Sequence, residues 1–474
     1  MSMFLFSLGL CKGAAVRIVR RAARVIGIAI FLSLLVGTGA GAADEITPVA
    51  SPMNPFLTQQ SRFTNVTYDI YPSSGIFSVQ ELTQGNIKAG PLLVHPHFGV
   101  AENYTDNVTR TDKTFGGKTS DWYTTYQPGL QIQLPVLGRH KIIMDYRAYL
   151  ERYSRDATLD VNDQTMSLNP VLVFPGGLTV KLLGELKNGH DYRGSATSAL
   201  GGGTSGSSTI NQFYNKEYGG EVELKSQTFV RASHKYIDYQ FTGPLAGTRV
   251  PGTAGDINTR NRMERYDSLA LGGRVAPNTY LYVKGMYQRE LYEVNKDLDS
   301  TVVTLAGGST WEGLAKSTGS FDIGWQTRTM DRASSRGTGV YGTMYFNGNF
   351  AWKPQEQTKV NVSFYRRTNE TVLAETRFYT GTGTTFDVNH AVTKKWNVTG
   401  QVMYEHDTYS GPITADNMRA VRQDDYLTFG GGLWYQIQPW LGERLNYLYT
   451  DRLSNFISTQ YNANQMMLSL QAQF

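Results

Sequence analysis

The histidines are the first residues to examine for chemistry, because imidazole binds metals and transfers protons near neutral pH. His95 and His97 are two positions apart on a predicted strand, so both side chains point to one face, as a pair of metal ligands could. No third ligand follows at a recognisable spacing. We therefore predict no metal site and interpret both histidines as wall or interface residues.

Acid–base catalysis is a second possibility. His190 precedes Asp191, and His406 lies between Glu405 and Asp407. Neighbours on a strand point to opposite faces, so neither histidine would lie beside its acidic neighbour as a catalytic pair requires. The sequence has no GxGxxG after a strand, no phosphate loop and no CxxCH haem motif. We predict that the protein is not an enzyme and needs no cofactor.

Two pairs of acids fall on shared strand faces, Glu221 with Glu223 and Glu405 with Asp407. Each pair would suit a divalent cation bound to lipopolysaccharide, or a constriction. We interpret them as hydrated wall residues, because charged faces are usually solvated.

The amino-acid composition indicates which kind of secondary structure carries these residues. The chain of 474 residues has 29 Tyr, 21 Phe and 49 Gly, yet its mean hydropathy is -0.34. This average excludes a bundle of membrane-spanning helices, and the aromatic and glycine content favours one large β structure.

The N-terminus predicts an exported protein. Residues 1–43 combine five basic residues, an apolar run from Val25 to Gly39 and a small-residue exit, which is typical of a cleaved signal peptide. Removing this leader lowers the basic count from 45 to 40, equal to the 40 acidic residues, so the mature chain is neutral and no nucleic-acid partner is expected. The single cysteine, Cys11, lies in the leader, which excludes a disulfide framework.

Turn-forming clusters recur about every 40 to 50 residues along the rest of the chain. They are LPVLGRHK, FPGGL, KSQTF, APNTY, AKSTG, KPQEQT, VTKKW and QPWLGE. Between them the sequence indicates strand, long polar loop and strand, with long loops at 194–209, 243–259 and 410–425. Short turns at one end and long loops at the other are typical of transmembrane barrels, which place the turns in the periplasm.

Strand patterns agree with this interpretation. In IIMDYRAYLER, Ile142, Met144 and Tyr146 share one face, and Asp145 and Arg147 share the other. Segments of ten residues or more suit tilted strands that cross a bilayer. We predict an all-β, transmembrane, antiparallel up-and-down barrel of about 18 strands (16–18) over residues 90–474. Residues 44–89 are predicted to form a periplasmic arm or partial plug.

Charges of both signs fall on the predicted inner faces, so weak ion selectivity is expected. The predicted pore-lining residues are Asp145, Arg147, Glu151, Lys181, Glu185, Lys284, Glu290, Arg328, Arg367 and Arg444.

Two short motifs resemble a known family. VHPHFGVAENYTDNV, with Tyr104, Asp106 and Asn107, resembles the entry strand of β-barrel porins often encoded with bacterial exopolysaccharide genes. YTTYQPGLQIQLP is similar to the Pro-Gly-Leu strand of that family. The resemblance implies an outer-membrane pore, with polysaccharide export as one function. The C-terminal residues Phe474, Leu470 and Leu468 resemble the signal that the barrel assembly machinery recognises.

The leading hypothesis is therefore a pore in the outer membrane of a Gram-negative bacterium. It would pass polar solutes or export exopolysaccharide, with membrane lipid, lipopolysaccharide and the assembly machinery as partners. Two alternatives stay open: a non-conducting barrel that displays surface loops, and a secreted soluble β-propeller or adhesin.

Overall fold

The computed structural model describes residues 87–111, 117–190, 212–241, 260–314, 316–332, 339–371 and 376–474. The predicted leader, residues 44–86 of the predicted arm, and the loops at 194–209 and 243–259 lie outside these ranges. None of the described helices has the length and apolar character needed to cross a bilayer.

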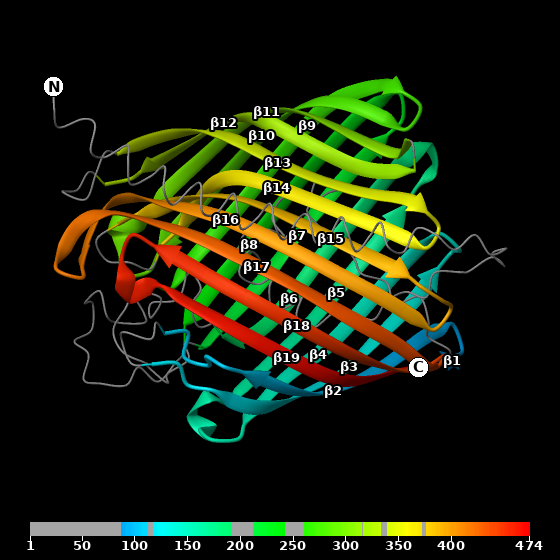
Figure 1. Cartoon of the computed structure of the whole chain (residues 1–474). Coiled ribbons are helices and arrows are strands. Elements are labelled where there is room, and N and C mark those ends of the chain that lie inside the picture. The colour runs from blue at the N-terminus through cyan, green and yellow to red at the C-terminus, as the bar shows by residue number, and fades with distance from the viewer. Residues whose placement is uncertain are drawn as a thin grey trace. The chain divides into compact units, whose positions relative to one another are not determined.

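Eighteen antiparallel strands, β2 to β19, form one closed sheet in which each strand pairs with the next along the chain (Figure 1). The strands are β2 (Leu92–Thr105), β3 (Asp121–Val136), β4 (His140–Tyr153), β5 (Val161–Val173), β6 (Leu178–His190), β7 (Gln212–Lys225), β8 (Thr228–Phe241), β9 (Arg262–Ala276), β10 (Thr279–Tyr292), β11 (Ser300–Leu314), β12 (Ser317–Met330), β13 (Val340–Gln355), β14 (Thr358–Glu370), β15 (Phe378–Ala391), β16 (Trp396–Ala415), β17 (Met418–Gln438), β18 (Leu441–Ser454) and β19 (Tyr461–Gln473). The predicted up-and-down barrel is confirmed. The propeller alternative is wrong, because the strands form one continuous ring.

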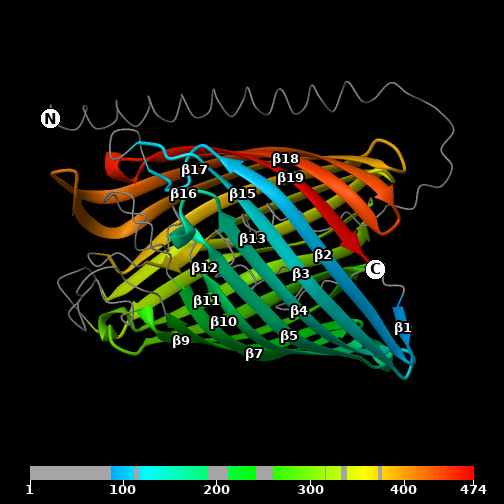
Figure 2. The ribbon, with the colours of Figure 1, turned by 90° about the horizontal axis from the view of Figure 1, so that it is seen from below.

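The ring closes where the last strand meets the first. β19 pairs with β2 from Gln465↔Thr105 to Gln473↔His97, and the two strands run side by side in Figure 2. The N–H of Phe474 then donates to the carbonyl of Pro96 at 3.0 Å. Beyond this point, the short strand β1 (Ile87–Ala89) pairs with β2 and covers the edge that β19 does not reach. Closure leaves no free strand edge at this seam, where hydrocarbon would not tolerate one.

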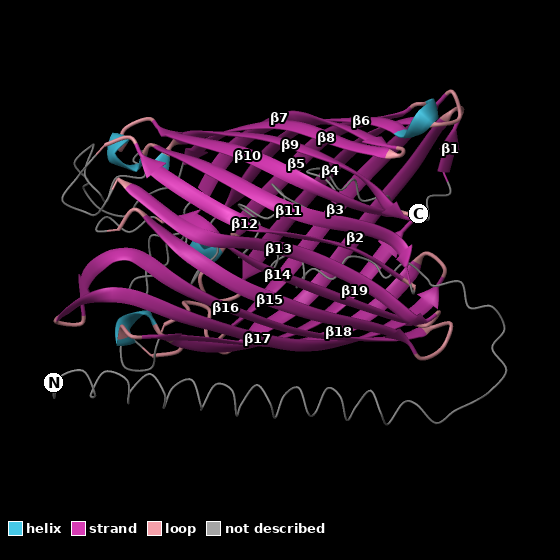
Figure 3. Ribbon diagram, turned by 90° about the horizontal axis from the view of Figure 1, so that it is seen from above, coloured by secondary structure: helices cyan, strands magenta, loops and turns pink. Residues whose placement is uncertain are grey.

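All eight predicted turn clusters connect consecutive strands, and they lie at one end of the barrel. Several contain a residue with the left-handed backbone that tight turns need, such as Asn278 at φ 55°. Most of the short 3-10 helices lie among the connections at the other end (Figure 3). The predicted asymmetry between short turns and longer connections is therefore present.

The predicted loop at 410–425 is wrong. This stretch continues β16 and β17 to lengths of 20 and 21 residues and closes on a two-residue turn at Asp416 and Asn417. Both turn residues have positive φ, 54° and 58°, as a type I′ hairpin requires. The proline that suggested a loop, Pro412, follows a break in the ladder after Thr408, where a strand tolerates proline. The hairpin extends beyond its neighbours in Figure 1.

Asn417→Val should destabilise this hairpin by about 1–2 kcal/mol, because a β-branched residue strongly disfavours the left-handed backbone. Limited proteolysis should then cut within residues 410–425 faster than in the parent protein. Asn417→Gly is the matched control and should retain the parent rate. Equal cleavage of the two variants would contradict the turn assignment.

Candidate functional site

The two faces of the barrel wall have opposite polarity. On β10, Leu281 and Val283 are 51% and 59% exposed, whereas Lys284 and Glu290 are 8% and 2% exposed. On β12, Trp325 is likewise exposed on the outer face, whereas Asp322 and Arg328 are buried on the inner face. A water-soluble domain has the reverse arrangement. The apolar outer face suits lipid, and the polar side chains lie on the enclosed side.

The predicted pore-lining residues are spread around the wall and form two pairs among themselves. Arg147 Nε lies 2.6 Å from Asp145 Oδ2 on β4. Arg328 donates both terminal nitrogens to Glu290, at 2.7 Å and 3.1 Å. Such fork-like pairs are among the strongest hydrogen bonds of proteins.

The other predicted residues contact partners that the prediction did not name. Two lysines form ion pairs, Lys181 with Glu221 and Lys284 with Asp322. Glu151 accepts hydrogen bonds from Tyr149 and Tyr153. Arg367 lies over the ring of Tyr365, Arg444 lies over the ring of Trp434, and Glu185 faces Glu217 in the strand register. Acids and bases therefore lie side by side at several places on the inner wall, while Glu185 faces a second acid.

One segment departs from the wall and folds into the barrel. β14 pairs with β13 only from Thr358 to Arg366, and residues 367–371 continue past that pairing. Thr368, Asn369, Glu370 and Thr371 are all at most 8% exposed. A wall strand would expose every second residue to lipid, so burial of both parities places this segment inside the barrel. We call residues 367–371 and 376–381 the inward hairpin end.

Contacts of the inward hairpin end with inner side chains support this placement. The N–H of Thr368 donates to Gln326 Oε1 on β12 at 2.7 Å, and Arg328 Nε donates to Thr368 Oγ1 at 3.2 Å. From the β15 side, the ring of Phe378 packs on Tyr341 of β13 with centroids 4.9 Å apart. The hairpin end therefore lies against the inner faces of β12 and β13.

A network of buried charges holds the tip of this segment. Its members, which we call the β9–β14 network, are Arg262, Glu264, Glu290, Arg328 and Glu370. Arg262 donates to Glu264 on its own strand at 2.6 Å and to Glu370 on β14. Four strands separate β9 from β14 in the wall, so this second contact crosses the enclosed space.

Hydroxyl groups complete the hydrogen bonding of the β9–β14 network. Tyr292 donates to Glu370 at 2.9 Å, Ser300 donates to Glu290 at 3.0 Å, and Tyr266 donates to Glu264. Buried ion pairs seldom add much net stability, but removing one partner is costly. The network therefore serves mainly to fix the position of the hairpin end.

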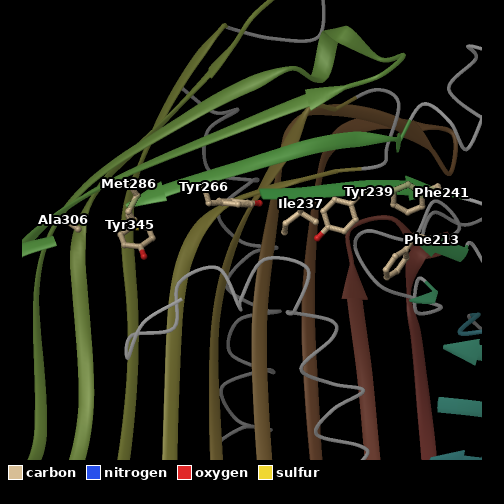
Figure 4. Packing of buried hydrophobic residues seen from close by; sticks show 8 residues of the cluster. All are labelled: Phe213, Ile237, Tyr239, Phe241, Tyr266, Met286, Ala306 and Tyr345. Atoms are coloured by element: carbon tan, nitrogen blue, oxygen red, sulfur yellow. The ribbon is translucent and has the colours of Figure 1, made fainter. Parts of the chain in front are cut away.

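An apolar cluster adjoins the network on the inner side of the wall. Figure 4 shows its side chains in a row: Phe213, Ile237, Tyr239, Phe241, Tyr266, Met286, Ala306 and Tyr345. Tyr266 belongs to both groups, since its ring packs in the row while its hydroxyl binds the network. The inner face therefore combines aromatic surface with charge.

A glycine on β11 makes room for contacts between side chains of its two neighbouring strands, β10 and β12. Lys284 and Tyr282 of β10 both reach Asp322 of β12, at 2.9 Å and 2.8 Å, across β11. A Cβ on Gly308 of β11 would lie 2.3 Å from Asp322 Oδ1. The missing side chain is thus what permits the contact.

A second group of charges lies on β16 to β18. Asp424 bonds Arg422 at 2.9 Å and Arg452 at 2.7 Å. Glu405 and Asp407, the acid pair noted in the sequence, are 7% and 0% exposed on the same inner side. They are buried, not hydrated as the sequence interpretation held.

The histidines behave as strand geometry predicts. His406 is on the face opposite its acidic neighbours, and its Nδ1 lies 2.8 Å from Asp425 Oδ1. His190 lies 2.9 Å from Asp163, while Asp191 is outside the described residues. His97 lies over Gly129 of β3. Within the described ranges, no three His, Cys, Asp or Glu side chains gather as metal ligands.

A closed wall with an apolar outside and a charged inside defines the class of outer-membrane β-barrels. Residues 83–474 match the family described as "Putative beta-barrel porin 2", and the chain belongs to that family. No curated protein sequence matches the chain.

Solved structures resemble the fold at low sequence identity. The FrpB iron transporter from Neisseria meningitidis is 12% identical with a TM-score of 0.42, and the match covers 82% of each chain. A BenF-like porin from Pseudomonas fluorescens Pf-5 is 10% identical with a TM-score of 0.41, covering 80% of this chain and 99% of the porin.

Sequence reasoning missed Arg262, Glu264, Glu370, Arg422 and Asp424. The first two could have been found, because the stretch RMERY places both on one strand parity with Tyr266. Arg422 and Asp424 were assigned to the loop that proved to be β17. No local pattern marks Glu370 as the tip of an inward segment.

Arg328→Met should lower the free energy of unfolding by about 3–5 kcal/mol, because it leaves the Glu290 carboxylate buried without its counter-charge. Urea unfolding of the refolded barrel measures the change. Adding Glu290→Gln should restore part of the loss. A single variant within about 0.5 kcal/mol of the parent would contradict the assignment.

Gly308→Ala should destabilise the barrel by about 1–3 kcal/mol, because the added methyl would force Asp322 away from Tyr282. Gly307→Ala is the matched control, since nothing lies within 4 Å of a Cβ there. Thermal unfolding should separate the two variants, and equal midpoints would argue against the role of Gly308.

Proposed function

We propose that this outer-membrane barrel is a pore for polar solutes, and that the inward hairpin end narrows its lumen. The observation that carries the proposal is the burial of residues 367–371 on the enclosed side of a polar wall. A segment folded into a barrel reduces the cross-section that a solute meets. The ten predicted residues would line the path around it.

The charge distribution supports weak selectivity between anions and cations. Inner acids are paired with inner bases at several places, as in Lys181–Glu221 and Lys284–Asp322. A strongly selective channel presents rings of one sign. The proposed pore would thus pass small charged and neutral solutes alike.

Exopolysaccharide is the second cargo we consider. Several tyrosines, including Tyr239, Tyr266 and Tyr345, lie on the inner side, and flat rings of this kind suit the faces of sugars where a face is accessible. This observation favours a carbohydrate over an apolar cargo, and oligosaccharide block of the current is its test.

We also propose that Phe474, Leu470 and Leu468 carry the assembly signal. All three side chains are exposed on the outer face of the closing strand. There they would be accessible to assembly machinery and then to lipid.

Planar-bilayer conductance tests the pore. The purified protein should give ohmic current, and Arg262→Ala combined with Glu370→Ala should raise the conductance, because the double substitution releases the tip of the hairpin end. Added oligosaccharide should reduce the current if sugars enter the lumen.

Arg265→Ala is the matched control, because Arg265 lies on the same strand as Arg262 but pairs with Asp267 on the exposed face. Its conductance should equal that of the parent. A parent barrel that carries no current above empty detergent would reject the pore and favour a structural barrel that displays surface loops.

A further inference from the structure

The inward hairpin end forms a small polar cradle where it meets β16. Gly381 of β15 lies directly opposite Asp407 in the strand register. A Cβ placed on Gly381 would lie 2.9 Å from Asn369 Nδ2, 3.1 Å from Asp407 Oδ1 and 3.2 Å from Glu405 Oε1. Side chains from strands on both sides of β15 therefore converge on one point above a glycine, where the described part of the chain places no atom.

Several polar atoms around this cradle lack a partner among the described residues. Both carboxylate oxygens of Asp407 are buried without a hydrogen bond, and so are Asn369 Oδ1 and the hydroxyls of Tyr409 and Tyr426. All four side chains are at most 5% exposed. Buried polar groups are nearly always paired, and an ionised carboxylate without a donor is especially costly. The cradle therefore requires an occupant.

The charges around the cradle indicate the sign of that occupant. Asp407 experiences the charges of Glu405, Asp424 and Arg422, and Glu405 experiences that of Arg367. Arg422 and Arg452 both form ion pairs with Asp424. These two arginines and one aspartate together carry one surplus positive charge. Arg367 offsets one of the two carboxylates. Among the described residues, no donor other than the adjacent Glu405 carboxyl reaches Asp407, so two buried acids face each other and the local charge at their oxygens is negative.

The chemistry of the surrounding atoms indicates a hard cation. Glu405 and Asp407 also line a small cavity together with Tyr426, Thr428 and Thr450, three residues that carry hydroxyl groups. Rotating the Asn369 amide exchanges its two ends and brings the unpartnered Oδ1 to the cradle. Carboxylate, amide and hydroxyl oxygens without sulfur or imidazole are the ligand set that Ca²⁺ prefers, with water completing its shell.

We propose that Glu405, Asp407 and Asn369 bind one divalent cation of the Ca²⁺ class above Gly381. The ion joins the inward hairpin end to β16 and supplies the positive charge that the buried acids need. This site does not depend on conduction: a barrel that carries no current can still bind the ion, and a conducting pore can lack it.

Terbium luminescence tests the site, because Tb³⁺ replaces Ca²⁺ on oxygen ligands and Tyr379 and Tyr426 of the cavity can sensitise its emission. The full-length protein in detergent, stripped with chelator, should show saturable emission with one strong site. Ca²⁺ should displace Tb³⁺, whereas methylammonium should not. Displacement by methylammonium alone would overturn the metal assignment in favour of an amine.

Three variants localise the signal. Asp407→Asn and Glu405→Gln should each weaken Tb³⁺ binding by about tenfold or more. Gly381→Ala keeps both carboxylates but fills the cradle with a methyl group, so it should have the same effect. Gly431→Ala on β17 is the matched control, because its Cβ would meet only an ordinary contact of 3.5 Å to Thr399.

Circular dichroism and the shift of the folded band on unheated gels establish that each variant forms the barrel. If the acid variants do not fold, Gly381→Ala against Gly431→Ala still decides the question. Emission that is absent in the parent, or unchanged in Gly381→Ala, would overturn the proposal.

Discussion

The ladder between β19 and β2 is the constraint on which the rest of the structure depends. In hydrocarbon every backbone amide must be paired within the protein, and a sheet achieves this only when its first and last strands meet. Once the ring is closed, each residue faces either lipid or the enclosed space. The exposed Leu468 and the buried Ser469, neighbours on β19, are direct products of this rule.

Much of the fold follows from local patterns in the sequence. The turn clusters and the alternation on β4 predict a barrel of about eighteen strands because both signals are short-range. The loop prediction for residues 410–425 was wrong because Gly, Pro, Asp and Asn are as common in tight hairpin turns as in loops. The inward hairpin end could not be predicted, since its burial depends on distant partners such as Gln326 and Arg262.

The charged side chains of the interior have two structural roles. Pairs between adjacent strands, such as Arg231 with Glu223, satisfy acids and bases where they lie. The β9–β14 network instead joins parts of the chain that the ladder keeps apart. Because arginine stays charged and presents several donors, it suits both roles. The strand glycines Gly308 and Gly381 contribute by leaving space that neighbouring side chains cross.

The short strand β1 has a consequence for chain connectivity. Ile87 lies opposite Val94 and the N–H of Phe474 bonds Pro96, so the two ends of the described barrel meet two positions apart along β2. A short linker could join them, and the ring of strands would then have no natural starting point. Circularly permuted versions, opened at any of the tight turns and refolded in detergent without the assembly machinery, should keep the same ladder.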